Sequence, residues 1–215
     1  MLPVTCPVAL AGLILLSPLV FASTPLPQFD RVMVLNEPRE IADAQLTSQD
    51  GEHFRLAQLR GKASLVFFGF TNCPDVCPAA MTKLSQLERS GLVDSARVNF
   101  TLISVDGERD LPAVMKKYLQ QFSKVFIGLT GDPTEVRKIA GAFRATFFKG
   151  ETSSADDSYS VAHSTQIFLI DQAGRLRAEL HDPTIEAMAG ITNAVLAEGS
   201  LQSLDLDSDR SQANE

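Results

Sequence analysis

The chain contains no tryptophan and only two tyrosines among its 215 residues, so it has few of the aromatic side chains on which nucleic-acid bases stack. Lysine and arginine form no cluster in the sequence, and the formal net charge is −7. Both absences argue against a nucleic-acid partner, because proteins of that class present a basic surface to the phosphates. Hydrophobic residues make up 45% and charged residues 21% of the chain, as in a globular domain with a sizeable core.

Charge is also absent from the N-terminus, where no acidic or basic side chain precedes Asp30. Residues 8–20 (VALAGLILLSPLV) form a short apolar run, and Val20 and Ala22 suit the small-residue positions of a cleavage site after Ala22. Residues 1–22 are therefore predicted to be a cleaved signal peptide. The length of the uncharged stretch also permits an uncleaved membrane anchor. Either segment would place the folded part outside the cytoplasm.

Cysteine is scarce: Cys6 falls within the signal or anchor, which leaves Cys73 and Cys77 as the thiols of the folded part. In an oxidising compartment, two thiols so close in sequence form a disulfide with each other or hold a metal ion. The chain has no third or fourth thiol for a structural zinc site, and the small loop between the two cysteines cannot staple a fold together. The pair is therefore a candidate for metal binding or for redox chemistry.

Apolar and amphipathic segments alternate along residues 41–199. Residues 63–70 (ASLVFFGF) and 98–105 (VNFTLISV) are continuous apolar runs, which are typical of strands buried on both faces. We expect a hairpin around residues 49–52, shorter strands at 126–129, 147–148, 159–162, 165–171 and 176–180, and helices at 73–90, 110–122, 132–143 and 183–199. This order predicts an α/β fold: a thioredoxin-like sandwich with a mixed central sheet, flanking helices and an inserted hairpin. The Pro-rich residues 23–40 are predicted to be a linker, and residues 200–215, which are poor in apolar side chains, a disordered tail.

The two cysteines lie where the first buried strand ends and a helix is expected to begin. With Cys73 as the N-cap and Pro74 at the first helical position, Cys77 lies one turn further along the same helix face. The positive end of the helix dipole is expected to lower the pKa of both thiols and to favour thiolate. Three residues separate the cysteines, whereas the usual redox pair has two. This spacing suits chelation of one soft or borderline metal ion, Cu(I) or Zn(II), and still permits a disulfide.

The chain has three histidines that could supply a further ligand. His53 falls in the predicted hairpin and His181 beside a predicted helix start, and neither position indicates a metal role. His163 lies between two strand-like segments, where a lone histidine is ordinarily a structural group. As a ligand, its neutral imidazole would complete a site of two sulfurs and one nitrogen, which copper tolerates in both oxidation states. The residue pattern by itself leaves the role of His163 open.

Four short segments follow one another along the chain: residues 68–78 (FGFTNCPDVCP), 103–110 (ISVDGERD), 126–131 (FIGLTG) and 159–171 (YSVAHSTQIFLID). Together they resemble the Sco/SenC family, the copper chaperones for cytochrome c oxidase assembly, over roughly residues 40–198. The resemblance implies a thioredoxin-like fold with an extra hairpin. It also implies a site for one copper ion per chain, Cu(I) or Cu(II), formed by Cys73, Cys77 and His163.

The same resemblance implies a cellular role. A family member would sit in the periplasm, usually held by a membrane anchor. It would deliver copper to the binuclear copper centre of cytochrome c oxidase subunit II, or reduce the thiols of that centre. Further implied partners are another copper-accepting protein, a thiol reductase or a second copper chaperone.

Two positions depart from the family pattern. Ala162 stands where the family has an aspartate beside the histidine, which leaves the affinity and redox potential of the site open but not the identity of its ligands. Gly107 replaces a proline and should only loosen a loop. The charged residues around it are expected to be helix caps and a solvated face: Asp106, Glu108, Arg109 and Asp110. Asp75, in the first turn of the expected helix, is a candidate for tuning the site.

Three functions compete at this point. A copper-binding assembly chaperone needs all three ligands, and the motifs favour it. The alternative is an enzyme, a periplasmic thiol–disulfide oxidoreductase, which needs only Cys73 and Cys77. A thiol peroxidase is disfavoured, because the folded part has no further cysteine to resolve an oxidised one.

Overall fold

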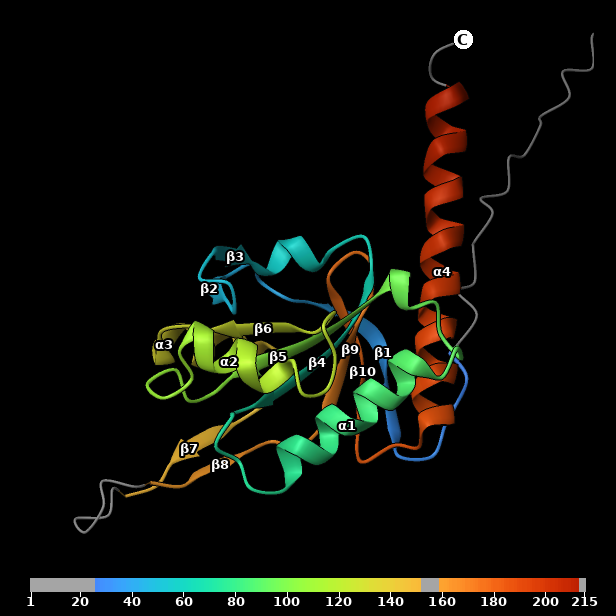
Figure 1. Cartoon of the computed structure of the whole chain (residues 1–215). Helices are drawn as coiled ribbons and strands as arrows, with labels where there is room; N and C mark the ends of the chain where they lie inside the picture. The colour runs from blue at the N-terminus through green and yellow to red at the C-terminus, as the bar shows by residue number, and fades with distance from the viewer. Residues whose placement is uncertain (1–25, 152–158, 213–215) are drawn as a thin grey trace, which may run out of the picture.

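The computed structural model describes residues 26–151 and 159–212, and Figure 1 shows how their helices and strands are arranged. The strands are β1 (Val32–Glu40), β2 (Gln45–Ser48), β3 (His53–Arg55), β4 (Ala63–Gly69), β5 (Val98–Ser104), β6 (Ile127–Thr130), β7 (Phe147–Lys149), β8 (Val161–His163), β9 (Ile167–Ile170) and β10 (Arg175–Leu180). The helices are α1 (Val76–Arg89), α2 (Pro112–Leu119), α3 (Pro133–Ala142) and α4 (Ile185–Gln212), and short 3-10 turns lie at Leu56–Leu59 and Ser95–Arg97.

Eight strands form one mixed sheet in the order β1-β10-β9-β4-β5-β6-β2-β3. β4, β5 and β6 are parallel neighbours, whereas β9 pairs with β4 in the antiparallel direction. Every residue of β4 is buried. Phe67 and Phe68 point to opposite faces of the sheet and are at most 1% exposed, so both faces are covered at this strand. The predicted mixed central sheet with flanking helices is therefore confirmed, and the apolar run of β4 reflects burial on both sides.

The helices pack at different parts of this sheet. α1 lies beside α4, which contacts β4, whereas α2 contacts β6 and α3 contacts β2 (Figure 1). Asp132 caps α3, because its carboxylate accepts a hydrogen bond from the backbone N–H of Thr134 at 2.8 Å. The predicted hairpin is also present: β2 and β3 pair around Gly51, whose φ of 82° suits a residue without a side chain.

One edge of the sheet brings together segments that are far apart in the sequence. β4 ends there at Gly69, paired in register with Ser104 at the end of β5. β9 begins there, because it runs in the opposite direction and pairs Ile167 with Phe67. β8, which ends at His163 and pairs with β7 in a separate two-stranded sheet, directly precedes β9. We call this edge, where β4 and β5 end and β9 begins, the carboxyl edge.

The first strand corrects a sequence prediction. A linker is predicted over residues 23–40, but Val32–Glu40 form β1 and pair with β10 at the border of the sheet. The register shifts between Val34 and Arg39, and Pro38 lies within this irregular part. A border strand with a bulge tolerates the missing N–H of proline, so the prolines here belong to a strand and not to a linker.

The last helix corrects a second prediction. The sequence predicts that the helix ends near Gly199 and that residues 200–215 are disordered, whereas α4 continues to Gln212. The segment from residue 200 to residue 212 contains no proline and no glycine, the two residues that interrupt helices most strongly. Because no such residue interrupts it, and extension of an existing helix needs little further ordering, the helix continues.

Residues 1–22, predicted to be a signal or an anchor, lie outside the described residues. Among the residues that the structure describes, no helix combines the length and the apolar character needed to cross a membrane.

Candidate metal centre

A turn joins β4 to α1 and contains the first cysteine. The backbone N–H of Cys73 donates to the carbonyl of Phe70 at 3.3 Å, which closes a tight turn. α1 begins at Val76 after the N-cap Asp75, which is exposed and makes no side-chain capping bond. The predictions that Cys73 caps the helix and that Pro74 opens it are therefore wrong, because this turn delays the helix start by two residues.

Cys77 lies in the first turn of α1 and its side chain is fully buried. The first N–H groups of a helix lack carbonyl partners within it, and that of Cys77 donates to the Sγ of Cys73 at 3.4 Å. Gly69 leaves the space for this sulfur, since a Cβ at that position would lie 2.9 Å from the Sγ of Cys77. The end of β4 and the start of α1 thus hold the two sulfurs together, and both cysteines are free thiols.

His163 is the last residue of β8, and its ring is fixed from several sides. The rings of Phe67 and Phe70 meet it edge to face, with centroids 5.8 and 5.6 Å away. Its Nδ1 lies 2.8 Å from the carbonyl oxygen of Ser164. Because a carbonyl only accepts, Nδ1 must be the protonated nitrogen in this contact, which leaves the lone pair on Nε2. That nitrogen faces the Sγ of Cys77 at 3.4 Å.

The structure therefore brings together the three residues that the motifs single out. The two sulfurs and an imidazole nitrogen all lie within 4.8 Å of one another. Metal–ligand bonds of about 2.0–2.3 Å at 120° would place such atoms about 3.5–4 Å apart, so only a small contraction is needed to hold an ion. Among the described residues, no other group of histidine, cysteine and acidic side chains converges in this way.

The electrostatics of Cys77 correct another prediction. Burial raises the pKa of its thiol well above the ordinary value, and the neighbouring Cys73 and the charge of Asp110 raise it further. The sequence predicts a lowered pKa from the helix dipole. Loss of water around a fully buried sulfur outweighs that dipole. The thiol of Cys77 is thus protonated near neutral pH, and a bound metal must displace its proton.

Burial shifts the pKa of His163 in the direction that favours metal binding. It lowers the pKa of the imidazole, and hydrogen bonding to the backbone of Ser164 and Phe68 opposes this shift only in part. The ring is therefore neutral at pH 7, and neutral imidazole is the form that binds metals. The carbonyl of Ser164 acts as the outer partner that orients such a ligand.

The other two histidines lie away from this cluster, as the sequence predicts. His53 is exposed on β3, where its Nδ1 lies 3.0 Å from the side-chain nitrogen of Gln45. His181 is exposed after β10, and its backbone N–H donates to the carbonyl of Arg31 at 2.8 Å.

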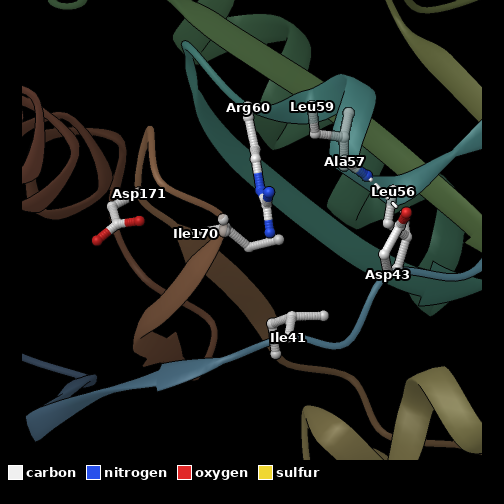
Figure 2. A pocket seen from close by; sticks show the side chains of 9 residues that line it. Ile41, Asp43, Leu56, Ala57, Leu59, Arg60, Ile170 and Asp171 are labelled. Atoms are coloured by element: carbon white, nitrogen blue, oxygen red, sulfur yellow. Dashed lines mark hydrogen bonds between the residues drawn. The ribbon is translucent and has the colours of Figure 1, made fainter.

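A cavity lies at the opposite end of the central strands, and Figure 2 shows its side chains. Its lining comprises Ile41, Asp43, Leu56, Ala57, Leu59, Arg60, Ile170, Asp171 and Gly174. Ile170 pairs with Ser64 at the start of β4, so the length of β4 separates the cavity from the carboxyl edge. Its two acidic side chains already form ion pairs, Asp43 with Arg55 and Asp171 with Arg175. With no cysteine or histidine in its lining, this cavity is not a second site for a soft metal.

Sequence reasoning missed the residues that support the site from the segment after β5. Asp106 and Asp110 are buried, with exposed fractions of 5% and 0%. The expectation that both cap a helix or face solvent is wrong, since the N-cap of α2 is Leu111. Glu108 does face solvent and pairs with Lys149 at 2.6 Å. The position of Asp106 just after a continuous apolar strand was the available signal, because side chains there point to the carboxyl edge. Asp110 lies further along the chain and had no such signal.

Asp106 and Arg109 fasten the segment before β8 to this edge. Asp106 pairs with Arg109 and accepts a hydrogen bond from the hydroxyl of Tyr159 at 2.5 Å. The guanidinium of Arg109 lies over the Tyr159 ring, 3.7 Å from its centroid, and over Phe70 at 5.8 Å. Tyr159 thereby holds the strand that ends at His163.

Ala162 occupies the place of the family aspartate. It is exposed and pairs with Phe148 of β7. Neighbouring residues of a strand point to opposite faces, so a side chain at 162 projects away from the face on which His163 meets the cysteines. In this chain the Ser164 carbonyl orients the imidazole.

A thiol pair lies at the junction of a central strand and a helix, and an imidazole reaches it from the segment before the next antiparallel strand. This arrangement is that of a thioredoxin-like protein with a candidate metal centre of two sulfurs and one nitrogen. The chain belongs to the SCO1/SenC family, whose sequence model matches residues 35–196. A SCO2-like protein of Rickettsia prowazekii is 34% identical over 131 residues, which cover 61% of this chain and 64% of that protein, just under two thirds of its length.

Solved structures agree with this assignment. ScoI of Bradyrhizobium japonicum with copper bound is 37% identical, with a TM-score of 0.66 over 73% of this chain and 99% of that one. A SCO1/SenC family lipoprotein from Bacillus anthracis is 26% identical, with a TM-score of 0.63 over 75% of this chain and 98% of that one. The predicted thioredoxin-like fold and the family resemblance are confirmed.

Proposed function

We propose that this protein is a copper chaperone that binds one copper ion per chain through Cys73, Cys77 and His163. The observation that supports it most is the convergence of two sulfurs and a free imidazole nitrogen within 4.8 Å. Thiolates are soft ligands and imidazole suits copper in both oxidation states, so this donor set fits Cu(I) and Cu(II) better than zinc. Similarity to a Sco protein with copper bound supports the same assignment.

The burial of the ligands suggests how copper would be handed on. Cys77 is 0% exposed and Cys73 8% exposed, and His163 is partly exposed. A ligand of the receiving protein would therefore reach the ion from the side of Cys73 and His163. As copper leaves, the buried thiol of Cys77 would regain its proton, and its raised pKa favours that release.

The receiving partner is proposed from family membership. Sco/SenC proteins serve the assembly of cytochrome c oxidase, so we infer delivery of copper to the binuclear copper centre of subunit II, or to another copper-accepting protein in its place. We further propose that the chain acts in the periplasm, with residues 1–22 as a signal or anchor and the folded domain following them. The apolar run of residues 8–20 and similarity to a lipoprotein support that location.

A thiol–disulfide oxidoreductase acting on a client's cysteines is the second candidate. The two free thiols on adjacent turns support it. It does not require an imidazole, whereas His163 presents its lone pair directly to Cys77. This contact favours the copper role as the principal one.

The test measures copper binding by the protein expressed from the full sequence and purified as the cells produce it. Binding is measured under anaerobic reducing conditions. Wild type should bind one Cu(I) ion per chain under these conditions. With Cu(II) added anaerobically after the reductant has been removed, it should show thiolate-to-copper charge-transfer absorption. His163→Ala should lose that absorption and bind copper at least about 10-fold more weakly, while the matched control His181→Ala behaves as wild type. Unchanged affinity and spectrum in His163→Ala would show that the ligand set is wrong. Thiol exchange that persists in His163→Ala and with a copper chelator present would favour the oxidoreductase.

A further inference from the structure

A buried carboxylate lies behind the turn that contains the first cysteine. Asp110 is 0% exposed, and burial raises its pKa. Among the described residues it takes part in no ion pair within 4.0 Å. A carboxylate so placed is costly for a fold unless hydrogen bonds compensate it. Its position therefore calls for a role beyond filling space.

The hydrogen bonds of its carboxylate join one turn to the end of one strand. Its Oδ1 accepts from the hydroxyl of Thr71 at 2.6 Å, and its Oδ2 accepts from the backbone N–H of Thr71 at 3.0 Å. The same Oδ2 accepts from the hydroxyl of Ser104 at 2.7 Å. Ser104 ends β5, and Thr71 lies two residues before Cys73. Asp110 thus ties the cysteine turn to the rigid end of a central strand.

The turn has few other restraints. Asn72, Pro74 and Asp75 are exposed, and Asp75 does not cap α1. The Cys73 N–H makes a long hydrogen bond to Phe70 at 3.3 Å. Cys77, by contrast, is held within a regular helix, and His163 is fixed between two aromatic rings. Of the three ligands, Cys73 depends most on contacts made by the turn itself.

We propose that Asp110 is a positioning residue of the metal centre, which holds Thr71 and thereby keeps the Cys73 sulfur at bonding distance from an ion bound by Cys77 and His163. This inference rests on the proposed copper-binding function. It concerns geometry: the carboxylate holds both polar groups of Thr71, because Oδ1 accepts from the hydroxyl and the backbone N–H is shared between Oδ2 at 3.0 Å and Oδ1 at 3.3 Å.

The test compares the copper affinity and absorption spectrum of Asp110→Asn, Thr71→Val and the double variant. Each variant is isolated in the same way as wild type. Asp110→Asn preserves the shape of the side chain but replaces one accepting oxygen by a donor, and Thr71→Val removes the hydroxyl alone. Both should weaken copper binding, by about 10-fold for Asp110→Asn, and shift the thiolate-to-copper absorption. The double variant should bind no more weakly than Asp110→Asn, because both changes break the same contact.

Asp171→Asn is the matched control. Asp171 is also a buried carboxylate, 3% exposed, which accepts from the backbone N–H groups of Ala173 and Arg175 in a turn at the far end of β9. This variant should lower the melting temperature and leave copper affinity and spectrum unchanged.

The outcomes separate the two proposals. If Asp110→Asn melts earlier but binds copper with wild-type affinity and spectrum, Asp110 is only structural and the inference is overturned. Additive losses in the double variant overturn it as well. If Asp110→Asn does not fold, Thr71→Val decides by the same measurements. Wild-type protein that binds no copper would overturn the proposed function and this inference together, whereas loss of binding in His163→Ala with normal binding in Asp110→Asn and Thr71→Val overturns this inference alone.

Discussion

Replacement of Gly69 by alanine should disturb two ligands at once. A Cβ at this position would lie 2.8 Å from the ring of Phe67 and 2.9 Å from the Sγ of Cys77, closer than packed heavy atoms approach. Both neighbours are fully buried and cannot swing into solvent. Phe67 in turn contacts the ring of His163. One methyl group therefore displaces the Cys77 sulfur directly and the imidazole through Phe67.

The size of the expected loss of stability follows from overpacking of the core. An added methyl in a well-packed core costs about 1–3 kcal/mol, and each kcal/mol lowers the melting temperature of a domain of this size by about 2–4 °C. We therefore expect Gly69→Ala to melt about 2–12 °C below wild type in its copper-free form. Copper affinity should fall as well, because the ligand atoms no longer converge.

The assay is thermal unfolding followed by circular dichroism, with copper titration of the folded protein at 25 °C. Gly141→Ala is the control: this glycine lies in α3, and a Cβ there meets no atom within 4 Å. It should be as stable as wild type or up to about 1 kcal/mol more stable, since alanine favours helix, with unchanged copper binding. A Gly69→Ala protein with wild-type melting temperature and copper affinity would refute the packing argument.

Three further predictions concern other contacts. Lys83 lowers the pKa of the exposed Asp182, and a carboxylate of lowered pKa contributes stability that is lost as pH falls through that pKa, below 3.8. Asp182→Asn should therefore melt below wild type at pH 6 and together with it near pH 2; an equal gap at both values would contradict this sign. Tyr159→Phe removes the hydrogen bond to Asp106 and should lower the free energy of unfolding by about 1 kcal/mol, measured by urea denaturation; an unchanged midpoint would disprove that contribution. Copper at 100 times its dissociation constant should stabilise the protein by about 2.7 kcal/mol, and a chelator should reverse the rise in melting temperature, while Cys77→Ala should show no rise.

Local patterns in the sequence were sufficient for most of the elements. The apolar run of residues 63–70 identifies β4 because a strand buried on both faces needs no polar positions. Asp132 before a proline marks the start of α3, and Gly51 marks the turn between β2 and β3. These features depend on residues within a few positions of one another. The same holds for the pairing of Cys73 with Cys77. Their spacing and their position at a strand–helix junction were enough to predict it.

Other features depend on contacts between distant segments, and the sequence alone misjudges them. The prolines of β1 indicate a linker until β10 is seen to pair with it. Asp110 has the position of a helix cap, but the approach of the Thr71 turn buries it. The pKa of Cys77 follows the same rule: the helix start predicts a lower value, and burial under β4 raises it.

The candidate metal centre was likewise predicted in part from the sequence and decided in part by the tertiary structure. The family resemblance alone named Cys73, Cys77 and His163 as copper ligands, whereas the residue pattern left metal and redox roles open. Only the tertiary structure decided that His163, 86 positions after Cys77, presents Nε2 to that sulfur at 3.4 Å. The physical reason is the antiparallel pairing of β9 with β4, which returns the chain to the carboxyl edge, where Phe67, Phe70 and the Ser164 carbonyl fix the imidazole.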